Sequence, residues 1–410
     1  MGNQPSLRRH QGMLWGMGLG GFLVNADNRA IAPMLPAIAG TLHVSTSAAA
    51  LLVSAYSIPY GLFQLVYGPI ADRIGKIRTI LIALGLFSLG TVVCGLVHTF
   101  AWLVVLRFIT GMFAAGIIPT TLAQIGDLFE LADRPRAIAF FMSLTTSGQA
   151  LGIVIGGLLA QYLSYRYLFI LIGFAAIPTL IGLWKRQKTD STRESASQNT
   201  SESERGPFWA RYRTLFAKRT SWLIYTLILL EGFAFYAGFT FLGVFGVSVI
   251  HLSYLIIGLL TATYSAGAFV GSRTLGFVLG KVTTRFMPIL GATLMTIAFA
   301  LDWAWHSSIV LMLSFIVLGL GFSYCHSTLQ TYATDLLPRA RATAMSVFAF
   351  SLFTGSGLGP MAAGAVFSAF GWDALLGSVT AAMAIFAGFT TLLIRQPRQM
   401  PQTQSSSLQS

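Results

Sequence analysis

Long apolar stretches alternate with short polar segments along almost the whole chain. Each stretch is roughly 20 residues or longer, the length that crosses a bilayer core of ~30 Å as an α-helix. The runs are continuous rather than alternating in polarity, which argues against a transmembrane barrel. We therefore predict twelve membrane-spanning helices, at residues 13–39, 46–71, 79–97, 102–125, 137–162, 167–184, 221–247, 254–279, 286–305, 309–333, 342–369 and 374–394.

Composition supports the same class. The chain has 410 residues, of which 55% are hydrophobic and only 10% charged, with a mean hydropathy of +0.71. A soluble fold of this size could not bury so much apolar surface, so lipid must cover it. The first apolar run is too long for a cleavable signal peptide and is expected to be the first helix.

Basic residues give an orientation. If the N-terminus is cytoplasmic, all but three of the 26 Lys and Arg residues fall in inside segments, the exceptions being Arg29, Arg107 and Arg166. The positive-inside rule then places both termini in the cytoplasm. The net charge of +13 is therefore an orientation signal that faces an anionic leaflet, and nucleic acid is not needed to explain it.

The chain also repeats itself. His43-Val44-Ser45 recurs as His251-Leu252-Ser253, and Gly68 and Asp127 recur as Gly276 and Asp335, all 208 positions later. A constant offset across several landmarks indicates a duplicated six-helix unit. We expect an all-α membrane protein with an N-terminal bundle at 1–186, a cytoplasmic linker at 187–219, a C-terminal bundle at 220–396 and a polar cytoplasmic tail at 397–410.

The predicted linker has two parts. Residues 187–205 are rich in Ser, Thr, Glu and Lys with almost no apolar side chains, which is typical of a disordered tether. Residues 208–219 instead place Phe208, Trp209, Tyr212, Leu215 and Phe216 on one helical face beside several basic residues. This pattern favours a helix lying in the membrane interface. A basic loop with incidental aromatics is the alternative.

One charged, glycine-marked hinge separates the second and third apolar runs. Its sequence, Tyr67-Gly68-Pro69-Ile70-Ala71-Asp72-Arg73-Ile74-Gly75-Lys76-Ile77-Arg78, resembles the signature loop of the major facilitator superfamily at Gly68, Asp72, Arg73, Gly75, Lys76 and Arg78. The alternative is an ordinary charged turn between two spans. The resemblance implies a twelve-helix transporter in which this loop helps to set the direction the protein faces, with Asp72 stabilising the outward-facing state.

Further motifs resemble the branch of drug and proton antiporters with twelve helices. Asp27 followed by Pro33 and Pro36 is similar to its helix-one pattern, and Arg107 with Gly111 to the core of a helix-four motif. Helix five contains glycines like those of the exporter motif, but the usual Gly-Pro pair reads Gly152-Ile153, and a Gly-Pro pair appears in helix eleven instead. We predict that these positions serve helix packing: Gly148, Gly152, Gly156, Gly157, Gly359 and Pro360.

Ionisable groups inside spans are the candidate site, because a charge at mid-bilayer is costly without a cavity or a partner. Four such residues are expected to serve proton coupling or substrate binding: Asp27, Arg29, Arg107 and Glu231. Asp27 and Arg29 are two positions apart and point roughly 200° away from each other on a helix. One of them should therefore face the central cavity and the other a neighbouring helix.

Alternatives stay open for each candidate. Asp27 is expected to load and release a proton, or else to be a static partner of an arginine such as Arg107. Glu231 is a second possible proton carrier, unless it lies close enough to the cytoplasmic end to be wet. The resemblance implies that Arg107 assists proton transfer, and a purely structural bond is its alternative. His326 beside Cys325 is expected to be hydrogen-bonded packing rather than a metal ligand.

These features together predict a secondary transporter of a bacterial plasma (inner) membrane. We expect proton-coupled efflux of hydrophobic or cationic small molecules by rocking of two bundles about a central site, by a monomer without metal or cofactor. An importer, a sugar or metabolite exporter, or a lipid-handling or sensing protein of the same fold are the alternatives. No nucleotide-binding glycine loop, Ser-His-Asp set or cysteine cluster is evident, so no enzymatic activity is expected.

Overall fold

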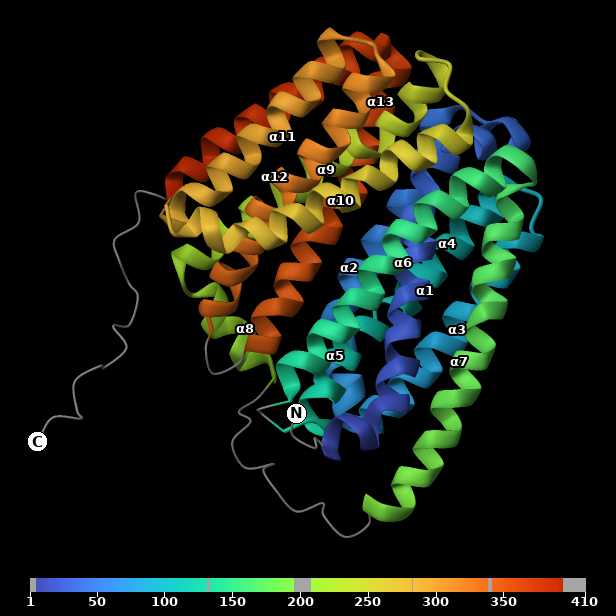
Figure 1. The fold of residues 1–410 in the computed structure, drawn as a ribbon, viewed down its shortest axis with the longest axis vertical. Coiled ribbons are helices and arrows are strands. Elements are labelled where there is room, and N and C mark those ends of the chain that lie inside the picture. The colour runs from blue at the N-terminus through green and yellow to red at the C-terminus, as the bar shows by residue number, and fades with distance from the viewer. Residues whose placement is uncertain (1–4, 131–132, 195–207, 282, 338–340, 394–410) are drawn as a thin grey trace, which may run out of the picture.

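The computed structural model describes residues 5–130, 133–194, 208–281, 283–337 and 341–393, and these residues form helices joined by short turns (Figure 1). The helices are α1 (Pro5–Leu42), α2 (Thr46–Ile74), α3 (Lys76–Leu96), α4 (Phe100–Ala114), α5 (Ile117–Leu128), α6 (Arg134–Tyr162), α7 (Tyr165–Glu194), α8 (Phe208–Phe216), α9 (Arg219–Ser248), α10 (Tyr254–Leu279), α11 (Met287–Ala304), α12 (Ser308–Asp335) and α13 (Arg341–Thr390), with 3-10 turns at Thr284–Phe286 and Thr391–Leu393.

Ten helical stretches in the described part of the chain are long and apolar enough to cross a membrane. One of them, Thr343–Thr390, contains two spans, because α13 bends at Gly371, whose φ of 80° favours glycine. α1 falls below the hydropathy of the other ten, with Asn25, Asp27, Asn28 and Arg29 in its middle, yet its 38 residues pack inside the bundle. Twelve spans result, as the hydrophobic pattern predicts.

Two predicted segments differ in local structure from the expectation. The fourth span is not one continuous helix, because α4 ends at Ala114 and α5 begins at Ile117, with Gly116 between them against the ring of Tyr67. The first part of the predicted tether, 187–194, is helical rather than disordered, because α7 continues to Glu194 beyond the apolar span Tyr165–Gln187. The stretch from Lys185 to Glu194 is polar but contains neither Gly nor Pro, so local helix propensity can carry the helix beyond its apolar part. The rest of the predicted tether, 195–205, lies outside the described residues.

The turns that precede α2 and α10 have the same geometry. His43 and His251 both adopt a left-handed backbone conformation, with φ of 52° and 59°. Two positions later, Ser45 accepts a hydrogen bond from the Ala48 amide and Ser253 from the Ile256 amide, so each serine caps the helix that follows. The repeat in the sequence therefore corresponds to a repeated local structure.

Glycines let paired helices approach closely within each half. On α6, a Cβ added at Gly148, Gly152 or Gly156 would collide with the α1 backbone near Phe22, Ala26 or Ala30. Gly359 on α13 meets the α9 backbone at Phe233 in the same way. Residues four positions apart share one face of a helix, so the α6 glycines form a continuous seam along α1.

Figure 1 shows the N-terminal half, blue to green, beside the C-terminal half, yellow to red. Extensive contacts between the halves join α2 to α13 and α6 to α10. Two direct hydrogen bonds between the halves lie at one end of the molecule: Ser368 donates to the Ser47 hydroxyl at 2.6 Å, and the Tyr254 amide donates to Gln161 at 2.9 Å. That end is opposite to the α2–α3 loop, which carries Arg73, Lys76 and Arg78 and which we call the basic end. Gly157, the last predicted packing glycine of α6, also joins the halves, against Tyr254 and Gly258.

The short helix α8 packs against the C-terminal half. Its Leu215 is fully buried, and Phe216 contacts the rings of Trp222 and Tyr225 at centroid distances of 5.1 and 6.1 Å. Just after it, the Lys218 ammonium donates to the Leu336 carbonyl at 2.7 Å. The predicted amphipathic segment is thus helical over Phe208–Phe216, and its place at a membrane surface stays a prediction.

Candidate functional site

Asp27 and Arg107 form a fully buried ion pair. Asp27 lies in the middle of α1, and Arg107 reaches it from α4 with an Nη1 to Oδ2 distance of 2.6 Å. The guanidinium also stacks on Tyr56 of α2, 4.2 Å from the ring centroid. Asp27 Oδ1 and Arg107 Nη2 have no hydrogen-bond partner. A buried pair that uses only part of its bonding capacity can exchange partners or take up a proton more readily than a saturated one.

Arg29 points away from Asp27, as the helical spacing predicts, and lines a pocket between the halves. Its guanidinium donates to the hydroxyl of Tyr236 on α9 and lies 4.7 Å from the centroid of that ring. Other lining residues come from both halves: Asn28, Ala32, Val53, Ser57, Phe239, Thr240, Phe353 and Ser356. The pocket is therefore polar near Arg29 and aromatic beside it.

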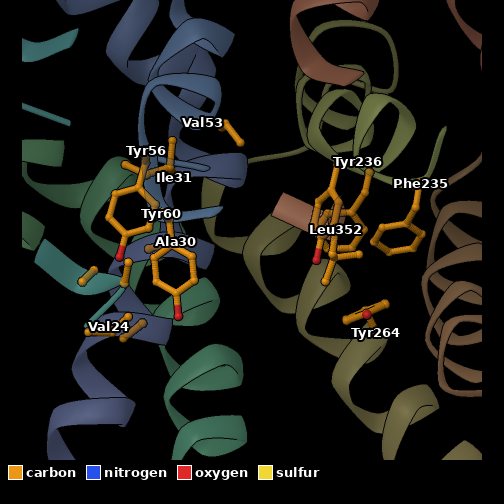
Figure 2. Close-up of a cluster of buried hydrophobic side chains, with 14 of the residues drawn as sticks. Val24, Ala30, Ile31, Val53, Tyr56, Tyr60, Phe235, Tyr236, Tyr264 and Leu352 are labelled. Carbon is orange, nitrogen blue, oxygen red and sulfur yellow. The ribbon is translucent and has the colours of Figure 1, made fainter. Parts of the chain in front are cut away.

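Aromatic rings surround this region from both halves (Figure 2). Tyr56 and Tyr60 of α2 stack on one side, with ring centroids 5.9 Å apart. On the other side, Phe235 lies 5.8 Å from Tyr264 of α10, and Tyr60 reaches across to Phe353 of α13 at 4.3 Å. Most of these side chains are buried, so they form apolar walls with hydroxyl groups at selected points.

Glu231 occupies a second buried position, in α9. Its Oε2 lies 3.1 Å from Nδ1 of His326 on α12, and its Oε1 has no hydrogen-bond partner. His326 stacks on Phe322 with ring centroids 4.6 Å apart and remains one-fifth exposed. Glu231 itself has no exposed surface, so it is not a wet residue near a helix end. His326 is hydrogen-bonded, in agreement with the expectation from sequence, but its partner is a carboxylate.

Asp302 is a third buried carboxylate, at a position that the sequence does not mark as a candidate site. It lies near the end of α11 with 1% of its surface exposed, and neither carboxylate oxygen has a hydrogen-bond partner in the structure. The sequence places it close to a helix end, where exposure is expected. Packing of α11 against α12 and α13 buries it instead.

The predicted gate loop adopts a glycine-dependent turn at the basic end. Gly75 separates α2 from α3 with a φ of 92°, and its amide donates to the Ala71 carbonyl at 3.0 Å. Lys76 forms an ion pair with Asp127 at the end of α5. Asp72, Arg73 and Arg78 are exposed, and Gly68 has open space beside it. The loop is therefore anchored to the fourth span within its own half.

Several side-chain pairs could not be predicted from the sequence, because their members are far apart along the chain. Arg29 and Tyr236 are 207 positions apart, and Glu231 and His326 are 95 apart. The presence of ionisable residues in apolar runs was the only available signal for either pair. Within the described residues, no cluster of three His, Cys, Asp or Glu side chains could hold a metal ion.

These features define a multi-pass helical membrane protein in which two similar bundles enclose a central pocket. The family model of the Major Facilitator Superfamily matches residues 17–289 and 250–409, and the chain belongs to this superfamily. The family relationship identifies it as a membrane transporter rather than an enzyme.

Two curated relatives come from Bacillus subtilis. The uncharacterized transporter YceJ is 29% identical, with 94% of each chain covered. Multidrug resistance protein 1 is 24% identical, with 82% of this chain and 85% of the relative covered. Among solved structures, a bacterial homologue of the human lysosomal transporter Spinster, inward-facing and unoccupied, superposes with a TM-score of 0.77 at 22% identity, covering 96% of each chain. The last similarity shows the shared fold.

Proposed function

We propose that this transporter exports small molecules with a large apolar surface across a bacterial inner membrane, in exchange for protons. The observation that carries the proposal is the Asp27–Arg107 pair, a carboxylate buried inside the span region with one oxygen unused. A buried carboxylate can bind a proton when its arginine partner is drawn away, and it can release the proton when the pair forms again. Arg107 then tunes the release.

The aromatic walls around the pocket support an apolar substrate, and the multidrug relative supports export. The expectation of a cationic substrate gains no support from the pocket, since its charged lining residue is Arg29. Glu231 with His326 is proposed as a second proton-binding position, in the other half. We further propose a monomer with both termini in the cytoplasm.

Alternating access requires the halves to separate at one end and close at the other. The bonds of Ser47 to Ser368 and of Tyr254 to Gln161 close the end opposite to the basic end. With the basic end in the cytoplasm, we propose that the conformation described here is inward-facing. In the opposite state, Asp72 is proposed to move toward the N-terminus of α13, whose positive end attracts a carboxylate.

Everted membrane vesicles with an internal pH dye test the proposal. A panel of hydrophobic dyes, neutral and charged, is added with an imposed proton gradient. We expect accumulation of at least one neutral or anionic dye together with substrate-triggered proton release, and loss of both in Asp27→Asn. Uptake only in right-side-out vesicles would overturn export. Accumulation that does not depend on the imposed proton gradient would overturn coupling.

A further inference from the structure

Arg29 is a cation in the pocket without a matching anion. It is partly exposed, and its guanidinium donates to the neutral Tyr236 hydroxyl, while Nε has no hydrogen-bond partner. Arginine keeps its proton at any physiological pH, so its charge cannot be removed by deprotonation. A guanidinium inside a membrane protein is stabilised by a counter-charge, and within the described residues Arg29 forms no ion pair with a carboxylate.

The buried carboxylates of the described spans do not supply that counter-charge. Asp27 points to Arg107 at 2.6 Å, on the other side of α1. Glu231 points to His326 at 3.1 Å, between α9 and α12. Asp302 lies on α11, which contributes no residue to the pocket. The pocket thus presents a positive charge to whatever enters it.

The surroundings of Arg29 suit an oxyanion. Asn28 lies beside it on α1, and three hydroxyl side chains from three helices line the same pocket: Ser57, Thr240 and Ser356. A guanidinium offers a planar fork of N–H donors that matches carboxylate and phosphate oxygens, and neighbouring amide and hydroxyl groups can donate to the remaining oxygens. Phe239 and Phe353 form the apolar part of the lining.

We infer that Arg29 receives the negatively charged group of an amphipathic substrate, a carboxylate or a phosphate, while the substrate's apolar part lies against Phe239 and Phe353. In the conformation described here, the Arg29 guanidinium donates to the Tyr236 hydroxyl. When substrate binds, its oxyanion takes the place of this hydroxyl as the acceptor. This inference rests on the proposed transport function and narrows its substrates to organic anions.

The position of Arg29 also connects binding to the two halves. The guanidinium belongs to α1, whereas Tyr236 and Thr240 belong to α9 and Ser356 to α13. An anion bound there contacts both bundles at once. Its affinity therefore depends on how the halves are arranged, which is the condition for a substrate to shift a conformational equilibrium.

Equilibrium binding of three probes with the same ring system tests the inference on the purified full-length protein in nanodiscs, by isothermal titration calorimetry. The probes are 2-naphthoate, 2-naphthyl phosphate and 2-naphthylmethylammonium. We expect at least one anionic probe to bind about tenfold more tightly than the ammonium probe. Comparison of the two anions then shows whether a carboxylate or a phosphate fits better.

Variants assign the effect to Arg29. Arg29→Gln should weaken binding of the preferred anion about tenfold and change the ammonium probe little, whereas Arg273→Gln, which removes an exposed charge on α10, should change neither. If Arg29→Gln fails to fold, Arg29→Lys and Tyr236→Phe serve. Arg29→Lys should lose several-fold affinity, whereas Tyr236→Phe should keep or raise it, because the competing acceptor is removed. Equal or tighter binding of the ammonium probe, no saturable anion binding, or unchanged affinity in the Arg29 variants would overturn the inference. Binding needs no proton gradient, so a failure of coupling or export leaves this test intact.

Discussion

The two halves of this transporter bury a carboxylate in the same kind of apolar environment but pair it with different bases. In the N-terminal half, Asp27 faces Arg107, whose charge is permanent. In the C-terminal half, Glu231 faces His326, an imidazole that carries a charge only if it is protonated. The first pair changes its charge only when the carboxylate takes a proton. In the second pair, the imidazole tautomer decides whether the ring nitrogen donates or accepts the hydrogen bond.

The packing of the halves differs much less than their chemistry. Gly152 on α6 touches the α1 backbone, and Gly359 on α13 touches the α9 backbone. The left-handed turns at His43 and His251 also agree. Close helix packing and turn geometry therefore persist in both repeats, whereas the buried ionisable residues have diverged. The duplicated features thus account for the shared fold, and the proposed proton exchange would depend on the features that differ between the halves.

The largest effect is expected from substitution of the two buried carboxylates, Asp27 and Glu231. Asp27→Asn should abolish proton-driven efflux, because an amide can neither take up nor release the coupling proton, while equilibrium binding of substrate can persist. Glu231→Gln should reduce transport less. Proton release in everted vesicles measures both, with folded protein checked by gel filtration. A severe loss in Glu231→Gln alone would move the main proton site to α9.

Substitution of the basic partners, Arg107 and His326, should lower the stability of the protein by different amounts in the two halves. Arg107→Ala leaves Asp27 buried without its partner, and breaking a buried pair in this way costs about 3–5 kcal/mol. His326→Gln keeps a donor near Glu231 and should therefore cost no more than about 1 kcal/mol, the value of one hydrogen bond. Thermal melting in detergent ranks the two. Asp27→Asn combined with Arg107→Gln should recover part of the loss, and equal melting of the two single variants would contradict the distinction between the pairs.

The glycine seams test what the halves share. Gly152→Ala and Gly359→Ala should each destabilise the protein by about 1–3 kcal/mol, since the new methyl group meets backbone atoms that cannot move aside easily. Gly182→Ala on α7 is the matched control, because a Cβ there meets open space and the change should be neutral or slightly stabilising. Melting temperatures measure all three. If Gly152→Ala lowered the melting temperature and Gly359→Ala did not, the two halves would not share this packing.

The smallest effect is expected at the basic end. The complete signature loop there, Gly68 to Arg78, belongs to the N-terminal half. Asp72→Asn should loosen the outward-facing state and impair transport partially, without loss of membrane insertion. Crosslinking between cysteines introduced on α2 and α13 at that end reports the population of each state. Unchanged crosslinking in Asp72→Asn would remove the gating role. Arg78→Gln, which removes a charge of the opposite sign from the same loop, provides the comparison.

The sequence by itself determined the class, the number of spans and the family. Continuous apolar runs define helices locally, and the motif at Gly68 to Arg78 is contiguous, so neither depends on how the helices are arranged. The opposite directions of Asp27 and Arg29 also followed from the helical period alone. These inferences required only neighbouring residues.

Tertiary structure decided which charges meet. Glu231 pairs with His326, Arg29 with Tyr236, and Asp302 becomes buried, because each helix has a rotation and a depth set by its contacts with several others. Hydrophobic periodicity is weak in helices that are apolar on nearly every side, so the sequence does not reveal which face turns inward. The sequence therefore identifies which ionisable residues are energetically costly inside a membrane. Which partner each of them contacts is determined by the assembled bundle.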